Sequence, residues 1–249
     1  MAVGESLNVF TTNTSGLKRK VESLKYLLQH LNIGVFTIQE TNLAKRGKLQ
    51  INNFDTFEAI RNKEGGGTII GAHISLEPIL IEEYSEDFEL VVIEITIEGK
   101  IIRVISGYGP QETWSIEKRM PFFTALEEEM TKAELAGRSI MVCFDANSKM
   151  GPHYIPGDPH SMSGNEKIVE GLIERHALSV ANKIGGKSKG VVTRERTTRD
   201  GTERSAIDLI LLSTVLVLGL EEIVIDEEKH FALESITKTK KSTNTNSKK

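Results

Sequence analysis

The chain has 249 residues, 39% of them hydrophobic, and a formal net charge of −4. This length supports one large domain with a full core, and the negative charge argues against a protein that coats nucleic acid through its overall field. There is no basic N-terminal segment followed by an apolar stretch, and no apolar run reaches the ~20 residues needed to span a membrane. We therefore expect an intracellular protein, nuclear or cytoplasmic, with no membrane partner and no secretion.

Composition also sets the expected domain boundaries. No low-complexity break interrupts residues 1–237, which we expect to form one domain. Residues 238–249 read KTKKSTNTNSKK and have almost no apolar surface to bury, which predicts a disordered basic tail. The single cysteine, Cys143, lies within an apolar run, so we expect a small core residue and no internal disulfide.

The first half of the chain alternates between apolar runs and one amphipathic stretch. After the strand LNVFTT, a helix is predicted by apolar residues three to four positions apart, namely Leu17, Val21, Leu24, Leu28 and Leu31. IGVFTIQ predicts a buried strand, and residues 53–60 and 67–74 a strand pair with a turn around Glu64 to Gly67. Residues 89–109 predict two long strands joined at Glu98 and Gly99.

The second half begins with a helical stretch from about Ser115 to Ala136, in which we expect Pro121 to open the main part, because proline is tolerated in a first turn. SIMVCF is the next strand, residues 148–164 are expected to form a loop, and Ile168, Leu172 and Ile173 mark another helix. Four further strands are expected at 191–195, 205–212, 214–219 and 221–225. Hairpins mixed with strand-helix-strand crossings predict an α/β (α+β) fold of two mixed sheets packed face to face with helices outside.

Polar residues recur where the apolar strands end: Asn13, Glu40, Tyr108, Asp145 with Asn147, and Asp208 within SAIDLILLS. Residues at the carboxyl ends of buried strands face the crevice where α/β sheets bind ligands. One such residue would be an ordinary turn former, but a core has no use for carboxylates, a phenol and amides at five such places. The set predicts an active site.

Three of these residues, Glu40, Asp145 and Asp208, are carboxylates with neutral polar companions, and hard oxygen ligands suit Mg²⁺ or Mn²⁺. No Cys/His cluster has the spacing of a zinc site. Magnesium usually takes one or two protein carboxylates and completes its shell with water and phosphate, which indicates phosphoryl chemistry. The glycines at 65–67 lack the lysine of a P-loop and fit a hairpin turn, and we expect no dinucleotide cofactor.

The order of the motifs adds a family resemblance. The segments are NTSGL with Asn13, IQET with Glu40, GYGPQE with Tyr108, FDANSKMG with Asp145 and Asn147, and RSAIDLIL with Ser205 and Asp208. Together they resemble the endonuclease/exonuclease/phosphatase superfamily, which includes apurinic/apyrimidinic endonucleases, over about residues 5 to 225. YGPQE, GNEKIVEGLIERHALSVAN and TRERTTRDGTERSAID look like the target-nicking endonuclease domains of non-LTR retrotransposons. The resemblance implies a four-layer sandwich and a Mg²⁺-dependent phosphodiesterase that nicks DNA.

The resemblance also implies roles for the candidate residues. Glu40 would hold the metal, with Asn13 nearby, and Asp145 would orient or deprotonate the attacking water. Asn147 and Tyr108 would position the phosphate and stabilise its charge. Asp208 would hydrogen-bond a histidine that binds the scissile phosphate oxygen.

The C-terminal motif departs from the family pattern, which ends in Ser-Asp-His. The only histidine after Asp208 is His230, preceded by Glu228 and Lys229. Two interpretations remain open: His230 is a degenerate version of the motif, or HFALESITKTK is a further strand and the motif follows Lys249. The Lys/Thr-rich tail favours the second, so we expect a catalytically incomplete chain. The rival functions are an inactive DNA-binding descendant and an RNA or phosphoinositide phosphodiesterase.

Several residues keep a structural alternative. The candidate DNA-binding residues Arg194, Arg196 and Arg199 fit a solvated hairpin as well as a DNA contact. Asn13 could instead cap a helix, although the motif order favours a ligand, and Tyr108 could pack against Pro110. Arg204 could replace a histidine as the partner of Asp208, and Trp114 fits a packing residue at a helix start better than a DNA-stacking one.

Overall fold

The computed structural model describes residues 6–43, 49–60, 66–85, 88–151, 164–184, 187–190, 192–198 and 201–225. For residues 194–198 and 201–205 only the backbone is described. His230, Arg199, the predicted tail at 238–249 and most of the predicted loop at 148–164 lie outside these ranges, so the predictions made for them stay predictions.

The N-terminal part of the chain builds a four-stranded mixed sheet in the order β1-β2-β4-β3. Its strands are β1 (Val9–Asn13), β2 (Val35–Gln39), β3 (Phe54–Ala59) and β4 (Thr68–His73). β1 and β2 run parallel, so that Asn13 pairs with Gln39 at their carboxyl ends. The crossover between them is α1 (Val21–His30), and β3 and β4 form the predicted antiparallel pair.

The rest of the chain builds a six-stranded mixed sheet in the order β5-β6-β7-β8-β13-β9. Its strands are β5 (Ile79–Tyr84), β6 (Glu89–Ile97), β7 (Lys100–Tyr108), β8 (Ser139–Asp145), β9 (Leu178–Val180) and β13 (Asp208–Ser213). β6 and β7 form the predicted hairpin, and its turn residues Glu98 and Gly99 both have positive φ, at 49° and 74°. Central residues with positive φ match the right-handed twist of the flanking strands.

Helices and two short ribbons make up the other elements of the described residues. The short helices are η1 (Ile74–Leu76), η2 (Ala181–Lys183) and α5 (Thr214–Gly219), and the long ones α2 (Ile116–Leu135) and α4 (Glu166–Arg175). Two two-stranded ribbons are formed by β10 (Ser188–Lys189) with β14 (Ile223–Val224), and by β11 (Arg194–Thr198) with β12 (Gly201–Ser205). We call the second of these the arginine ribbon.

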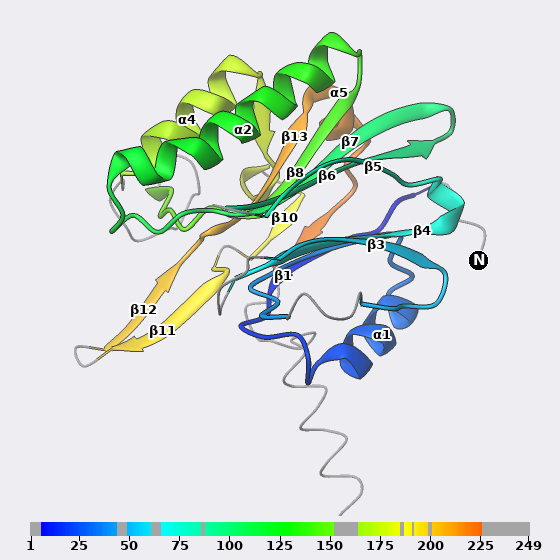
Figure 1. Ribbon diagram of the computed structural model, residues 1–249, viewed down its shortest axis with the longest axis horizontal. Coiled ribbons are helices and arrows are strands. Elements are labelled where there is room, and N and C mark those ends of the chain that lie inside the picture. The colour runs from blue at the N-terminus through cyan, green and yellow to red at the C-terminus, as the bar shows by residue number, and fades with distance from the viewer. Residues whose placement is uncertain are drawn as a thin grey trace, which may run out of the picture.

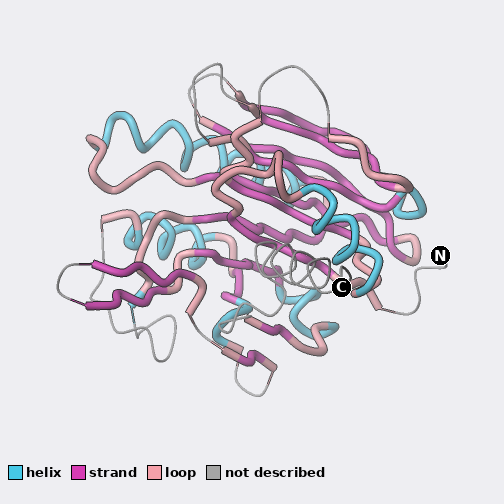
Figure 2. Tube along the Cα trace, turned by 90° about the horizontal axis from the view of Figure 1, so that it is seen from below, coloured by secondary structure: helices cyan, strands magenta, loops and turns pink. Residues whose placement is uncertain are grey.

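The two sheets lie face to face, with α1 on the outside of the four-stranded sheet and α2 and α4 on the outside of the six-stranded one (Figure 1). Three buried apolar clusters separate these layers. Phe36 and Ile38 belong to the cluster beneath α1, Val91 and Val104 to the cluster between the sheets, and Phe122 to the cluster beneath α2. The predicted four-layer sandwich is therefore confirmed, and Figure 2 shows the strands of the sheets from below as magenta tubes that run across the view.

Two predictions about elements are wrong. Residues 214–219, TVLVLG, form the helix α5 instead of a strand. A short apolar run cannot be assigned by periodicity alone, and here Leu216, Val217 and Leu220 meet the core between the sheets as one helical face. Pro121 does not open α2, which begins five residues earlier at Ile116 and continues through the proline.

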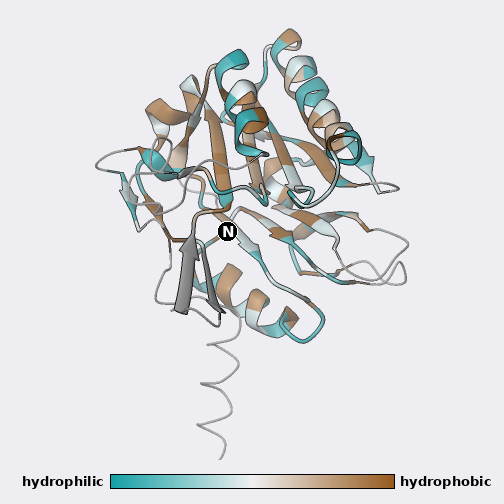
Figure 3. Cartoon of the chain, turned by 90° about the vertical axis from the view of Figure 1, so that its left-hand side faces the viewer, coloured by the Kyte–Doolittle hydropathy of each residue, from teal (hydrophilic) through white to brown (hydrophobic). Residues whose placement is uncertain are grey.

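The helices of the described ranges show apolar and hydrophilic residues side by side, as Figure 3 illustrates. None of them is long and apolar enough to cross a membrane. Cys143 is fully buried, which raises the pKa of its thiol to about 12, and the prediction of a core cysteine is confirmed.

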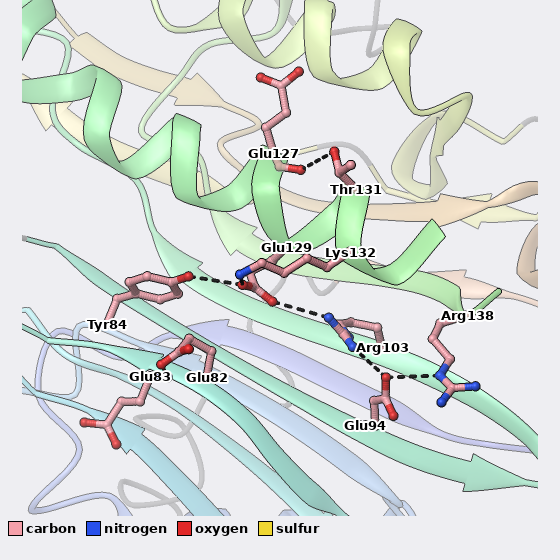
Figure 4. A network of polar contacts seen from close by, with 10 residues as sticks. All are labelled: Glu82, Glu83, Tyr84, Glu94, Arg103, Glu127, Glu129, Thr131, Lys132 and Arg138. Carbon is pink, nitrogen blue, oxygen red and sulfur yellow. Dashed lines mark hydrogen bonds and ion pairs between the residues drawn. The ribbon is translucent and has the colours of Figure 1, made fainter. Parts of the chain in front are cut away.

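A buried ion network fastens α2 to the six-stranded sheet (Figure 4). The guanidinium of Arg103 donates to Glu129 at 3.3 Å and to Glu94 at 2.7 Å, and Glu94 also accepts from Arg138 at 3.2 Å. The Glu129 side chain is fully buried and accepts from the Tyr84 hydroxyl at 3.1 Å. Burial alone would raise the pKa of Glu94, but the two arginines outweigh it and lower that pKa.

We predict that Arg103→Met destabilises the protein by about 2–3 kcal/mol, because the fully buried Glu129 and the partly buried Glu94 lose the cation that they share and keep Lys132 and Arg138. Urea denaturation measures the change. The control is Lys25→Met, which breaks the exposed ion pair with Glu22 and should cost less than about 1 kcal/mol. Equal effects of the two substitutions would show that the network contributes no more than a surface pair.

Candidate active site

Strand alternation places the candidate residues on the faces that the two sheets turn toward each other. Successive side chains of a strand point to opposite faces, so Val104, Ser106 and Tyr108 share one face of β7, and Met141, Cys143 and Asp145 one face of β8. Both series begin in the apolar cluster between the sheets and end on a candidate site residue. On β2 the same face carries Val35, Thr37 and Gln39. The interface between the sheets thus becomes polar toward one end.

Register aligns four ionisable or polar residues in one row across the six-stranded sheet. Glu89 pairs with Tyr108, Tyr108 with Asp145, and Asp145 with Asp208. Asp208 begins β13, which is antiparallel to β8, so it reaches this edge from the opposite direction. The expectation that all the candidates lie at carboxyl ends is therefore wrong for Asp208, although its position at the same edge follows from the pairing.

The Asp145 carboxylate is held at both oxygens. Its Oδ2 accepts a hydrogen bond from Asn13 Nδ2 at 2.8 Å, and its Oδ1 accepts one from the backbone N–H of Asn147 at 2.8 Å. Asp145 is 1% exposed, and the bond to Asn13 joins the two sheets. Asn13 is not a helix cap, because α1 begins at Val21 and follows Lys20.

Glu40 lies directly after β2 and faces the end of β7. Its Oε1 accepts from the Tyr108 hydroxyl at 2.6 Å, and its Oε2 accepts from Ser15 Oγ at 2.9 Å. Tyr108 therefore makes a specific polar contact across the sheets, beyond any packing against Pro110. The two hydroxyl donors fix both oxygens of the Glu40 carboxylate.

The backbone around the site contains unusual conformations. Glu40 has φ of 50°, Asn147 of 43° and Ser15 of 45°. Left-handed φ is uncommon for non-glycine residues and costs free energy unless the surrounding structure enforces it. Such outliers cluster at functional sites, and three of them here belong to one hydrogen-bonded group.

Close backbone approach explains two glycines in the same region. A Cβ at Gly109 would lie 2.8 Å from the carbonyl oxygens of Asp145 and Ala146. Gly67 has φ of 90°, and a Cβ there would lie 2.5 Å from Thr41 Oγ1. Both glycines let a loop lie directly against the segment that follows a site strand.

The Tyr108 phenol is held in its protonated form. Burial raises its pKa most, and the hydrogen bond to Glu40 and the charges of Glu40 and Asp145 raise it further, outweighing the opposite effect of the Asn147 side chain. A neutral phenol at ordinary pH can donate a hydrogen bond to an anionic oxygen, and here that oxygen belongs to Glu40.

The loop carrying Asn147 is fixed from beneath by Asn165, at the start of α4. Asn147 Nδ2 donates to the carbonyl of Gly109 at 2.7 Å. The fully buried Asn165 donates to the carbonyl of Pro110 at 2.8 Å and accepts from Arg119 Nη1 at 2.6 Å. Asn147 is thereby locked between the ends of β7 and β8.

The arginine ribbon is attached beside Asp208. Thr193 Oγ1, just before the ribbon, accepts from the backbone N–H groups of Ile207 and Asp208 at 2.9 and 3.1 Å. The ribbon then extends away from the two sheets (Figure 1). Arg194 pairs with Ser205 and Arg196 with Glu203 in its antiparallel register. A hairpin is confirmed here, whereas its contact with DNA stays a prediction, as does Arg204 as a partner of Asp208.

Sequence reasoning did not single out four residues that organise the site: Ser15, Glu89, Asn165 and Asn182. Asn182 donates to the carbonyl of Asp208 at 3.1 Å and so holds the start of β13. Glu89 is 1% exposed and accepts from the N–H of Gly67 at 3.0 Å. Glu89 did carry a signal, since it begins an apolar strand that pairs with the strand ending at Tyr108.

The donor chemistry fits one hard divalent cation. In the described ranges, no three or more His, Cys, Asp or Glu side chains are arranged to hold a metal ion jointly. Glu40 offers one carboxylate, and Asn13 Oδ1 is an amide oxygen that accepts from Ser15 N at 3.1 Å. A single carboxylate with neutral oxygens fits Mg²⁺, which keeps several waters and takes substrate phosphate oxygens. Mn²⁺ accepts the same oxygen ligands.

Comparison with known proteins identifies the fold. No model of a known protein family matches the sequence, and no curated protein sequence matches it. The endonuclease domain of TRAS1, a telomere-specific non-LTR retrotransposon, aligns with a TM-score of 0.61 at 15% identity, over 85% of this chain and 87% of that domain. The apurinic/apyrimidinic endonuclease LMAP from Leishmania major aligns with a TM-score of 0.68 at 13% identity, over 84% and 80%.

A 3′-5′ exonuclease from Neisseria meningitidis, NExo, aligns with a TM-score of 0.67 at 17% identity, over 88% of this chain and 91% of its own. Similarity at this level of identity shows the fold alone. The chain has the fold of these solved structures, in agreement with the four-layer sandwich that the motif resemblance implies.

We predict that Tyr108 ionises only well above pH 10, the ordinary value for the phenol. Because its pKa in the folded state is raised above that in the unfolded state, its contribution to stability is complete below about pH 10 and is lost as pH rises further. Ultraviolet titration of phenolate in the wild type and in Tyr108→Phe measures this. The difference between the two curves should show one late-titrating phenol, and a difference centred near pH 10 would contradict the prediction.

Proposed function

We propose that this protein is a Mg²⁺-dependent phosphodiesterase that nicks DNA, of the retrotransposon endonuclease type. One observation carries the proposal: Asn13 bonds to Asp145 and Tyr108 to Glu40, so that the site residues of both sheets meet in one hydrogen-bonded group. The fold agrees, because the proteins it resembles are nucleases, and one solved NExo structure is bound to a product DNA hairpin.

In this proposal Glu40 and Asn13 hold the cation, which would neutralise charge on the phosphate and on the departing oxygen. Asp145, oriented by Asn13 and the Asn147 N–H, accepts the proton of a water that adds to phosphorus. The bond between phosphorus and the 3′ oxygen breaks, and the departing oxygen takes a proton from solvent, which leaves a 3′-hydroxyl and a 5′-phosphate. Tyr108 is protonated at neutral pH and donates its one hydroxyl hydrogen to Glu40 in the free protein; once Glu40 engages the cation, that hydrogen would turn to a phosphate oxygen.

Asp208 completes the row beside Asp145, where the resemblance requires a histidine bound to the scissile phosphate. The chain should turn over slowly if His230 does not reach Asp208, since loss of one such charge-stabilising group typically costs ~10²–10³ in rate. His230→Ala distinguishes the cases. It should leave slow nicking unchanged, and loss of robust nicking would identify His230 as the catalytic histidine.

The rival functions share the same fold, and tests of which substrate is bound or cleaved distinguish them. An inactive descendant would bind duplex DNA without nicking it under any metal condition. An RNA or phosphoinositide phosphodiesterase would cleave its own substrate and bind duplex DNA without the steep salt dependence that phosphate contacts produce. The arginine ribbon beside Asp208 favours a polyanionic nucleic acid over a small phosphorylated molecule.

We predict that Glu40→Gln lowers Mg²⁺-dependent nicking of supercoiled plasmid by about 100-fold or more, because the one carboxylate ligand loses its charge. The matched control is Glu98→Gln, the same change in the exposed turn between β6 and β7, which should nick like the wild type. Stability should barely change in either variant. Full activity of Glu40→Gln would remove Glu40 from the metal site, and Mn²⁺ titration by calorimetry gives the same comparison if turnover is too slow.

A second prediction concerns the arginine ribbon. Changing Arg194, Arg196 and Arg199 together to Ala should weaken binding to all duplex sequences and flatten the log-log salt dependence by about 0.9 for each lost phosphate contact. The control removes the same charge from exposed lysines elsewhere, Lys25, Lys100 and Lys189. If both triple variants keep the wild-type salt slope, the ribbon is a solvated hairpin and DNA binds elsewhere.

A further inference from the structure

Glu40 is held in a conformation that its own backbone disfavours. Its φ of 50° lies in the left-handed region, which a non-glycine residue keeps only where neighbouring contacts enforce it. The Glu40 carbonyl accepts from Gly16 N at 2.7 Å, and the next carbonyl, of Thr41, accepts from Leu17 N at 2.8 Å. These bonds come from the same side of the molecule and do not connect Glu40 to the six-stranded sheet.

Gln39, the residue directly before Glu40, supplies a connection between the sheets. Its side chain is completely buried and points from β2 into the interface. Its Nε2 lies 3.1 Å from Ser106 Oγ on β7 and 3.4 Å from the carbonyl oxygen of Cys143 on β8. These are the strands that end at Tyr108 and Asp145, so one amide contacts both strands that carry the opposite half of the site.

The buried Gln39 amide reduces the stability of the fold, which indicates that it does more than link the two sheets. Among the described residues, Gln39 Oε1 has no hydrogen-bond partner. A buried acceptor left without a partner destabilises the fold, whereas an apolar side chain of similar volume at the same place would avoid that penalty. An apolar residue would also extend the adjoining cluster that contains Val35 and Met141.

The residue after Glu40 is connected to the six-stranded sheet as well. Thr41 N donates to the carbonyl of Gly67 at 3.2 Å, and Gly67 N donates to the buried carboxylate of Glu89 at 3.0 Å. Glu89 is paired with Tyr108 in the neighbouring strand. Both neighbours of Glu40 in the chain are therefore connected to the six-stranded sheet that Glu40 faces. Gln39 contacts this sheet directly, and Thr41 is connected to it through Gly67.

We propose that Gln39 is a positioning residue that sets the Glu40 carboxylate relative to Tyr108 and Asp145 across the sheet interface. This inference rests on the proposed function, in which Glu40 holds the cation. Gln39 touches neither cation nor substrate. It acts by fixing the end of β2 against β7 and β8. Gln39 thereby sets the position of the Glu40 carboxylate relative to the Asn13 amide oxygen, so that both oxygens can bind one cation.

The test measures Mn²⁺ binding to the purified chain by calorimetry and by electron paramagnetic resonance, together with thermal unfolding. Gln39→Met keeps the side-chain volume and removes the amide. Groups that orient a metal ligand typically contribute about 10–100-fold in affinity, so the Mn²⁺ dissociation constant should rise by about that factor, with a changed resonance spectrum. Ser106→Ala removes one acceptor of the Gln39 amide and should weaken binding severalfold, in the same direction.

Thr68→Val is the matched control. Thr68 is fully buried on β4, and its hydroxyl also crosses the interface to Ser106 Oγ, at 2.8 Å. If Gln39 has a purely structural role, Gln39→Met and Thr68→Val should lose similar thermal stability, and both should bind Mn²⁺ as tightly as the wild type. The positioning role predicts that affinity falls only for Gln39→Met and Ser106→Ala.

The outcomes separate the two claims. If wild type binds Mn²⁺ more tightly than Glu40→Gln does, and Gln39→Met binds as tightly as wild type, the positioning role is overturned and the proposed function stands. If Gln39→Met does not fold, Ser106→Ala provides the test. A Mn²⁺ affinity of Ser106→Ala equal to that of the wild type would also overturn the positioning role. If Glu40→Gln binds Mn²⁺ as tightly as wild type, the metal assignment fails, and the inference about Gln39 fails with it.

Discussion

The interface between the two sheets is the constraint on which the site depends. Over most of its area this interface is apolar, with residues such as Val91 and Val104 fully buried. Toward one end it becomes polar, first with Thr37 and Ser106 and then with the candidate site residues. Hydrophobic burial fixes the separation and register of the sheets, and the polar end then places side chains from both sheets within hydrogen-bond distance. A shift of either sheet would separate Asn13 from Asp145.

The same interface explains why costly features persist at the site. Left-handed backbone at Glu40 and Asn147 and a buried amide oxygen at Gln39 each reduce stability. Three apolar clusters and the buried Arg103 network hold the surrounding layers in place. Strain of this kind suits a site that must present oxygen ligands before substrate arrives, because preorganised groups need no rearrangement at the moment of reaction.

The sequence predicted most of the fold and part of the site for identifiable reasons. Local residue preferences determine the long apolar strands and the turn at Glu98 and Gly99, so β6, β7 and the two-sheet fold class could be predicted from the sequence. The helix at 214–219 was not, because its helical face appears only against the core. The meeting of Glu40 with Tyr108 depends on how the sheets are stacked, which no spacing reveals. Contacts such as Glu89 with Gly67 join a side chain to a backbone group and leave no residue-type pattern.

Anomalous scattering from a crystal soaked in Mn²⁺ tests the central claim most directly, because it locates the cation without requiring turnover. The account predicts one strong peak at coordination distance from a carboxylate oxygen of Glu40, beside Asn13 and within the hydrogen-bonded group that joins the sheets. A cation bound elsewhere in the chain, with no density at Glu40 at saturating Mn²⁺, would contradict it.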